Sequence, residues 1–91
     1  MKFSVLADIL ERENLISNVV INRDCDVTDL NLMDKDYRDF NDHTAYFIDA
    51  SLVKFYTAIP DCLFYSGTLP PLKEKVLINA AQISPDATAS V

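Results

Sequence analysis

Short apolar runs separated by polar turns constrain this fold more than any other feature. Residues 44–48 and 61–65 are almost continuously apolar and rich in aromatic side chains. Runs of this length and composition are typical of strands covered on both faces of a parallel sheet. Between Thr28 and Leu32, apolar and polar side chains alternate, which is the period of a half-buried strand. The pattern therefore predicts a small sheet.

One amphipathic helix precedes these strands. From Phe3 to Leu15, apolar side chains recur every three or four residues, and this spacing predicts a helix that begins at residue 3 or 4. Ser4 is a plausible N-cap and Asn14 lies near the expected end. Residues 16–22 contain the triplet Val-Val-Ile, which favours extended structure and predicts a short edge strand or an ordered loop.

Three other segments have less regular patterns. Residues 50–58 favour a short helix or an irregular crossover, which Pro60 ends because proline lacks the backbone donor. Residues 35–40 allow at most two turns of helix. Residues 72–82 fit either a helix or a buried strand, and periodicity does not decide between them. The tail, 83–91, has the pattern of a frayed end or of an element cut short.

The length of 91 residues predicts a single domain that spans 1–91. We expect an α/β fold with three to four short strands in a mixed, mainly parallel sheet, packed by the N-terminal helix and short helical segments. A core of this size is small, so self-association or attachment to a larger protein is a reasonable expectation.

The net charge of −6 argues against direct contact with nucleic acid, since phosphates would be repelled. No run approaches the ~20 apolar residues of a membrane span, and the N-terminus lacks the pattern of a secretory signal. We therefore expect a cytoplasmic protein without membrane contact. In that compartment Cys25 and Cys62 would be two reduced, buried thiols.

The residue inventory excludes several kinds of site. Gly67 is the only glycine in the chain, which excludes the glycine-rich phosphate loops and leaves other positions of positive φ to Asn or Asp. Cys25, Cys62 and His43 lack zinc-ligand spacing, and the acidic run from Asp34 has Asp39 where a calcium loop requires glycine. We expect no metal and no cofactor.

Catalysis is also not expected. His43 is the one side chain whose ordinary pKa suits general base chemistry near neutral pH, and its position before a strand is typical of a turn residue. The many carboxylates lie in polar connections, where nothing indicates the burial that raises a carboxyl pKa for acid catalysis. The sequence predicts a protein that is not an enzyme.

One candidate binding edge remains. If the strands are parallel, their carboxyl ends at 49–51 and 66–68 meet at the same edge of the sheet, where open α/β sheets bind ligands. Ordinary loop polarity is the alternative explanation. The candidate ligand-binding residues are Tyr46, Asp49, Ser51, Tyr65, Ser66 and Thr68.

The order of these elements carries a resemblance to a known family. An N-terminal helix opening with Met-Lys-x-Ser, the runs at 26–34 and 44–51, and the segment 60–65 resemble the N-terminal region of PucR-type bacterial transcriptional regulators. The resemblance implies a non-catalytic regulatory domain that senses a small-molecule effector or transmits a signal, while a helix-turn-helix elsewhere contacts DNA. It also implies a strand at Val76–Ala80.

Two alternatives stay open beside the regulator. A stand-alone interaction or dimerisation module would expose an apolar patch, for which Phe55 and Tyr56 or residues 19–21 are candidates. The chain is also similar to the small N-terminal domain of Mur peptidoglycan ligases, although Asp29 replaces a glycine common to both families. In the regulator, we expect a homodimer or docking to the rest of the protein.

Overall fold

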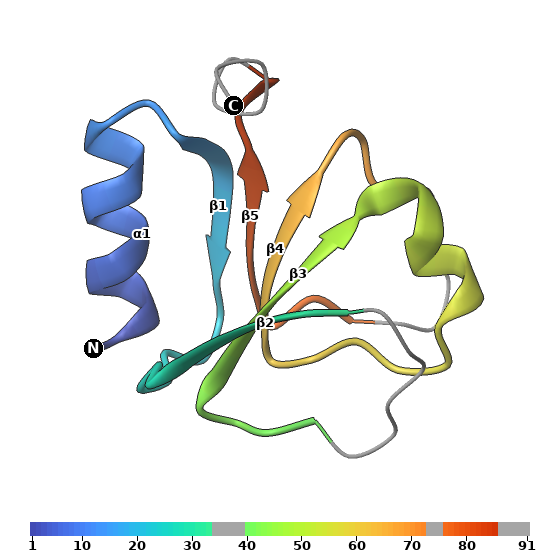
Figure 1. Ribbon diagram of the computed structural model, residues 1–91, viewed down its shortest axis with the longest axis horizontal. Coiled ribbons are helices and arrows are strands. Elements are labelled where there is room, and N and C mark those ends of the chain that lie inside the picture. The colour runs from blue at the N-terminus through green and yellow to red at the C-terminus, as the bar shows by residue number, and fades with distance from the viewer. Residues whose placement is uncertain (34–39, 73–75, 86–91) are drawn as a thin grey trace.

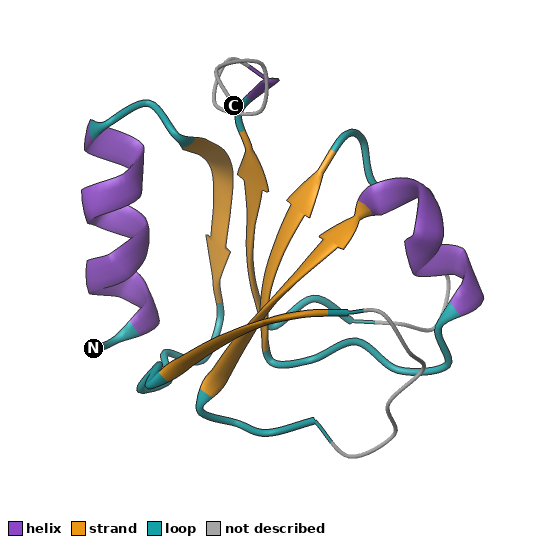
Figure 2. Ribbon diagram, in the orientation of Figure 1, coloured by secondary structure: helices purple, strands orange, loops and turns teal. Residues whose placement is uncertain are grey.

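The computed structural model describes residues 1–33, 40–72 and 76–85. These residues form one helix, five strands and one 3₁₀ helix, η1 (Figures 1 and 2). In chain order the elements are α1 (Phe3–Arg12), β1 (Ile16–Ile21), β2 (Asp29–Leu32), β3 (Thr44–Asp49), η1 (Ala50–Phe55), β4 (Cys62–Ser66) and β5 (Asn79–Ile83).

The five strands form one sheet in the order β1-β5-β4-β3-β2. Strands β2 to β5 run parallel to their neighbours, and β1 pairs antiparallel with β5. The predicted α/β fold with a mixed, mainly parallel sheet is therefore confirmed. The predicted count of three to four strands is wrong, because the structure has five. Of the two alternatives for residues 16–22, the edge strand is confirmed, since β1 pairs with β5 at the edge of the sheet.

Asparagines take the positions of positive φ that glycine usually fills. Asn14 has φ 59°, and the amide of Leu15 donates to the carbonyl of Leu10 at 2.9 Å, the bond that closes a helix in a Schellman motif. Asn18 has φ 51° at the irregularity between Ser17 and Val20 in the β1–β5 pairing. The expected use of Asn in place of Gly is confirmed at both positions.

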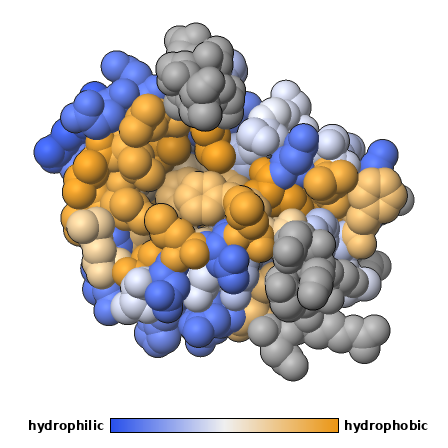
Figure 3. Space-filling view, viewed as in Figure 1, coloured by the Kyte–Doolittle hydropathy of each residue, from blue (hydrophilic) through white to orange (hydrophobic). Residues whose placement is uncertain are grey.

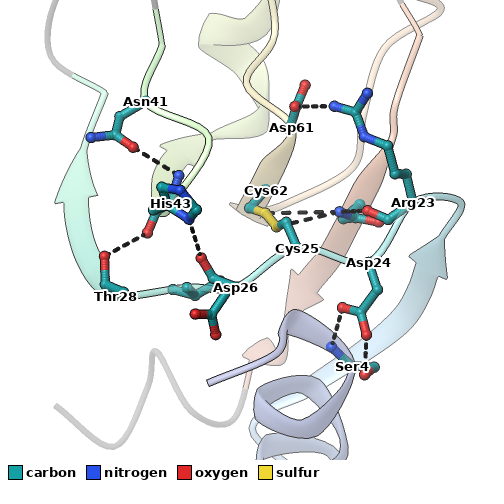
Figure 4. Close-up of a disulfide and its surroundings, with 12 residues drawn as sticks. Ser4, Arg23, Asp24, Cys25, Asp26, Thr28, Asn41, His43, Asp61 and Cys62 are labelled. Atoms are coloured by element: carbon teal, nitrogen blue, oxygen red, sulfur yellow. Dashed lines mark hydrogen bonds and ion pairs between the residues drawn. A yellow bond between two sulfur atoms is a disulfide. The ribbon is translucent and has the colours of Figure 1, made fainter.

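The start of α1 is stabilised by a residue distant in sequence. Ser4 was expected to cap the helix, but it lies inside α1, whose N-cap position is Lys2 with no side-chain bond. The carboxylate of Asp24 accepts hydrogen bonds from the Ser4 amide at 3.0 Å and from Ser4 Oγ at 2.6 Å (Figure 4). An anion at a helix N-terminus accepts hydrogen bonds from free N–H groups. Asp24 therefore stabilises the start of α1, the role expected of Ser4.

The two faces of the sheet pack against different elements. On one face a core cluster joins the sheet to η1 and the segment after it; its buried members are Met33, Tyr46, Ile48, Ala50, Val53, Tyr56, Leu63, Tyr65 and Ala80. On the other face a second cluster joins the sheet to α1; its buried members are Phe3, Ala7, Ile16, Val27, Ala45, Cys62, Phe64 and Ala81. The rings of Phe3 and Phe64 lie 5.3 Å apart between their centroids.

Several expectations about single elements can be compared with the structure. Within β3, residues 44–48 are buried or half-buried as predicted, and η1 confirms the short helix in 50–58. All four residues of β2 are exposed, so its predicted half-burial is wrong; β2 is an edge strand. Of the predicted helix at 35–40 and the tail at 83–91, residues 35–39 and 86–91 lie outside the described residues.

The last strand is displaced from its expected position. It spans Asn79–Ile83 rather than Val76–Ala80, and Val76 is 73% exposed. Asn79 explains the shift, because its side chain is fully buried and donates to the carbonyl of Arg23. The backbone amide of Asn79 also donates to the carbonyl of Asp61 at 3.0 Å. This bond places Asn79 beside Cys62 in the β4–β5 register.

Cys25 and Cys62 form a disulfide, so the expectation of two reduced thiols is wrong. The bond ties the connection between β1 and β2 to the first residue of β4 (Figure 4). The buried amide of Asn79 lies 3.6 Å from Cys25 Sγ and 3.8 Å from Cys62 Sγ. The disulfide and Asn79 therefore join three segments at one corner of the sheet.

Replacing both cysteines with serine should lower the free energy of unfolding by about 4 kcal/mol, the loop-closure entropy of a cross-link between residues 37 apart. Urea denaturation of the double variant and of the oxidised wild type measures the difference. Wild type treated with a reductant is the control and should match the double variant. Equal stability of the oxidised wild type and the double variant would contradict this role for the bond.

Candidate functional site

The predicted binding edge forms in part. Asp49 and Ser66 are partners in the β3–β4 register, so the parallel strands bring their carboxyl ends together as expected. The carboxylate of Asp49 is already engaged, since Oδ1 accepts from the amide of Ser51 at 3.0 Å and from its Oγ at 2.9 Å. These bonds hold the pKa of Asp49 below its usual value. Asp49 thus caps η1.

The two tyrosines proposed for this edge do not join them. Tyr46 and Tyr65 are buried in the cluster on the η1 face, and Tyr46 Oη accepts from the amide of Asn41, which precedes β3, at 3.2 Å. Burial raises the pKa of Tyr65. Thr68 is exposed beyond Gly67. The structure therefore brings Asp49, Ser51 and Ser66 together but not the two tyrosines.

A polar hollow of about 320 Å³ lies before the first residues of β3 and β4. Asp61, on its wall, forms an ion pair with Arg23. Among the described residues, no three His, Cys, Asp or Glu side chains lie close enough together to hold a metal ion. The hollow is lined by Phe40, Asn41, Asp42, Ala58, Ile59, Pro60 and Asp61.

A second hollow of about 270 Å³ is entirely apolar, and we call it the apolar groove. It lies between α1 and the sheet, where Figure 3 shows hydrophobic side chains gathered within a more hydrophilic surround. None of the six residues predicted for the carboxyl edge lines it. The groove is lined by Leu6, Leu10, Leu15, Ile16, Leu30, Phe47, Phe64 and Ile83.

The groove exists because α1 is too narrow to cover the sheet. Five strands spaced ~4.8 Å apart give a sheet about 19 Å wide, whereas a helix with its side chains is about 10 Å in diameter. In Figure 1, α1 lies at the β1 side of the sheet. The part of this face formed by β3 and β2 is consequently left without a helix among the described elements.

Strand β2 supplies the exposed wall of the groove. Leu30 pairs in register with Ala45, and Leu32 with Phe47, so both leucines lie on the same face as the α1 cluster. Leu30 is 61% exposed and Leu32 is 68% exposed. The alternation at 28–32 indicates this apolar face, but the burial that it predicts within the domain does not occur.

The apolar patches expected from the sequence do not coincide with the apolar groove. Phe55 is exposed, but Tyr56 is buried, and its hydroxyl donates to the carbonyl of Met33 at 2.8 Å. Val20 and Ile21 are each 39% exposed on β1, so the exposure expected at residues 19–21 is confirmed for these two, at the opposite edge of the sheet from β2. The prediction of a patch that includes Tyr56 is wrong.

His43 stabilises the connection beside the groove. Its Nδ1 lies 2.9 Å from the carbonyl oxygen of Asp26 (Figure 4), and its own carbonyl accepts from the amide of Thr28 at 2.8 Å. The carboxylate of Asp26 lies 2.9 Å from the amino group of Met1, and this contact lowers the pKa of Asp26. These contacts fix the chain just before β2.

Comparison with family models, with curated proteins and with solved structures found no match to this chain. Within residues 1–33, 40–72 and 76–85, no helix is long and apolar enough to cross a membrane.

A polar residue on the exposed wall should be tolerated. Leu30→Asp should change the free energy of unfolding by no more than about 0.5 kcal/mol, because the side chain is largely in solvent. Phe64→Ala, on the floor of the groove, should cost about 3 to 5 kcal/mol, since Phe64 is only 1% exposed. Urea denaturation of both variants tests the pair, and a large loss for Leu30→Asp would show that β2 belongs to the core.

Acid should weaken the α1 contact. Hydrogen bonds from the side chain and amide of Ser4 lower the pKa of Asp24 below 3.8, so its stabilisation is present above the unfolded pKa and is lost as pH falls through the folded pKa. Urea midpoints measured from about pH 6 to about pH 2 should fall less steeply for Asp24→Asn than for wild type. Ser4→Ala should reduce the wild-type slope in part, and parallel profiles for all three proteins would contradict this assignment.

Proposed function

We propose that this chain is a non-catalytic protein-interaction domain and that the apolar groove is its binding surface. The observation that carries the proposal is the pair of leucines on β2, more than half exposed and continuous with an apolar hollow. A contiguous apolar patch surrounded by polar residues is typical of an interaction site.

The chemistry of the groove supports binding rather than catalysis. All eight lining residues are aliphatic or aromatic, so the groove offers no acid, base or nucleophile to a bound molecule. His43 and Asp24 are engaged in contacts that hold α1 and the start of β2 in place. An apolar surface of this kind gains affinity by excluding water from a partner's side chains.

The resemblance to PucR-type regulators suggests a setting for such a surface. A regulatory domain must transmit its state to the rest of a regulator or to another subunit, and a docking groove provides the physical contact. Sensing of a small effector at the carboxyl edge has less support, because the Asp49 carboxylate is bonded to Ser51. We therefore propose signal transmission through protein contact as the regulatory role.

Site-specific photo-crosslinking tests the proposal in the native host. A photoreactive phenylalanine derivative at Leu30 should give one discrete protein adduct, and the adduct should be lost when Leu32→Asp is added. The matched control is the same probe at Leu52 on η1, which is 44% exposed and lies outside the groove. Equal adducts from both positions, or none from Leu30, would contradict an interaction surface at the groove.

A further inference from the structure

We infer that the Cys25–Cys62 disulfide is a reversible redox switch, which a dithiol reductant opens while the domain stays folded. Opening frees the connection between β1 and β2, which holds the start of α1. The inference is supported by the unequal exposure of the two cysteines, by the hydrogen-bond donor beside their sulfurs and by the contacts that remain after reduction.

The two cysteines differ in access to solvent. Cys25 lies in the connection between β1 and β2 and is partly exposed, whereas Cys62, the first residue of β4, is only 1% exposed. An external thiolate attacks one sulfur of a disulfide and expels the other. We therefore expect attack on Cys25 Sγ and release of Cys62 as the first thiolate.

The buried side chain of Asn79 stabilises the sulfur that is released. Its Nδ2 donates to both sulfurs, at 3.6 Å from Cys25 Sγ and 3.8 Å from Cys62 Sγ. A hydrogen bond to a thiolate favours the charged form, and a more stable thiolate leaves faster. Asn79 therefore offers a donor to Cys62 Sγ as negative charge develops on that buried sulfur.

The exchange conserves atoms and electrons with a dithiol as the reductant. One thiolate of the dithiol bonds to Cys25 Sγ, and the Cys25–Cys62 bond breaks with its electron pair on Cys62 Sγ. The second thiolate of the dithiol then attacks the reductant's own sulfur in this mixed disulfide and releases Cys25 as a thiolate. The dithiol leaves as a disulfide, oxidised by two electrons, and its two protons end on Cys25 and Cys62.

Contacts beside the disulfide keep the two thiols near each other after reduction. Arg23 forms an ion pair with Asp61, the residue before Cys62 (Figure 4). Asn79 donates to the carbonyl of Arg23 and accepts from the Arg23 amide at 3.3 Å. These bonds do not involve sulfur, so they hold residue 23 beside β4 and β5 in either redox state. The cysteines can then re-form their bond without refolding of the domain.

Reduction removes a covalent anchor from the segment that holds α1. The carbonyl of Cys25 accepts from the amide of Phe3 at 2.8 Å, and the neighbouring Asp24 carboxylate accepts from Ser4. In the oxidised state this segment is bonded to β4 through Cys62. Loss of the cross-link should raise the population of a local opening in which the start of α1 separates from the connection.

Reduction of the oxidised chain by dithiothreitol, followed by alkylation and mass spectrometry, tests the exchange. The rate should rise in proportion to dithiothreitol and change less than about twofold in urea below the unfolding transition, because the folded domain reacts. Glutathione, a monothiol, should be trapped on Cys25 in at least about tenfold excess over Cys62. A rate that follows global unfolding as urea is added would overturn the switch, and trapping mainly on Cys62 would overturn the route of attack.

NMR relaxation dispersion, which reports exchange on the μs–ms timescale, tests the effect on α1. The amides of Phe3 and Ser4 should show exchange in the reduced chain and in the Cys25→Ser/Cys62→Ser variant, but not in the oxidised chain. The amides of Phe47 and Phe64, in β3 and β4, are the control and should show none in any of the three. Equal profiles at Phe3 and Ser4 in both redox states, or unfolding on reduction, would overturn the switch.

The consequence for binding rests on the proposed function. The connection contacts α1 and leads into β2, and both elements line the apolar groove, so its release should loosen the groove and weaken binding. With the photoreactive probe at Leu30, in an extract of the native host whose free thiols are blocked, the oxidised chain should give at least about threefold more adduct than the double serine variant.

This experiment separates the regulation from the proposed function. Equal adducts from the oxidised chain and the double serine variant would overturn redox control of binding but keep the groove as an interaction surface. No adduct from the oxidised chain would overturn the proposed function, whereas the exchange and relaxation measurements would still decide whether the disulfide is a switch.

Discussion

The buried side chain of Asn79 is the contact on which the arrangement of this domain depends. Strand β5 comes last among the described strands but lies between β1 and β4. Strand β1 is therefore joined to β4, β3 and β2 only through β5. Asn79 donates to the carbonyl of Arg23, accepts from the Arg23 amide at 3.3 Å, and lies beside both disulfide sulfurs. A buried amide without such partners would be strongly destabilising, so these bonds select the register of β5.

The open face follows from how few helices accompany the sheet. Parallel strands are normally covered on both faces, and here the described elements supply one α-helix for one face and a short 3₁₀ helix with loops for the other. The central strands remain buried, whereas the β2 wall stays in contact with water. The same shortage of helix that limits the core of the domain therefore creates its apolar groove.

Elements with a strong apolar periodicity were predicted well from the sequence. Features that depend on contacts between distant segments were not. The helix near residue 3 and the strand from residue 44 followed from apolar spacing, and the parallel meeting of Asp49 and Ser66 followed from the order of the strands. The role of Asp24 at the start of α1, the register of Asn79 and the Cys25–Cys62 bond each join segments far apart in the chain. Local patterns hold no information about such pairings.

The sequence also did not predict the apolar groove, because burial depends on how distant segments assemble. Alternation at 28–32 marks one apolar side of a strand, but it does not say whether the domain or a partner covers that side. The sequence predicts one amphipathic helix and several strands. One helix is too few to cover a face of such a sheet, and this imbalance indicates an uncovered face. Burial is a property of the assembled sheet, and Leu30 and Leu32 look the same in sequence whether they are covered or exposed.

The position of β5 also bears on how the protein is made. β1 and β4 are both synthesised before residues 79–83, so the growing chain holds two strands whose shared neighbour is still missing. Their apolar side chains and unpaired edges are open to wrong contacts during that interval. The sheet can close only when β5 joins it, which makes the addition of residues 79–83, rather than the formation of α1, the event that connects β1 to the parallel strands.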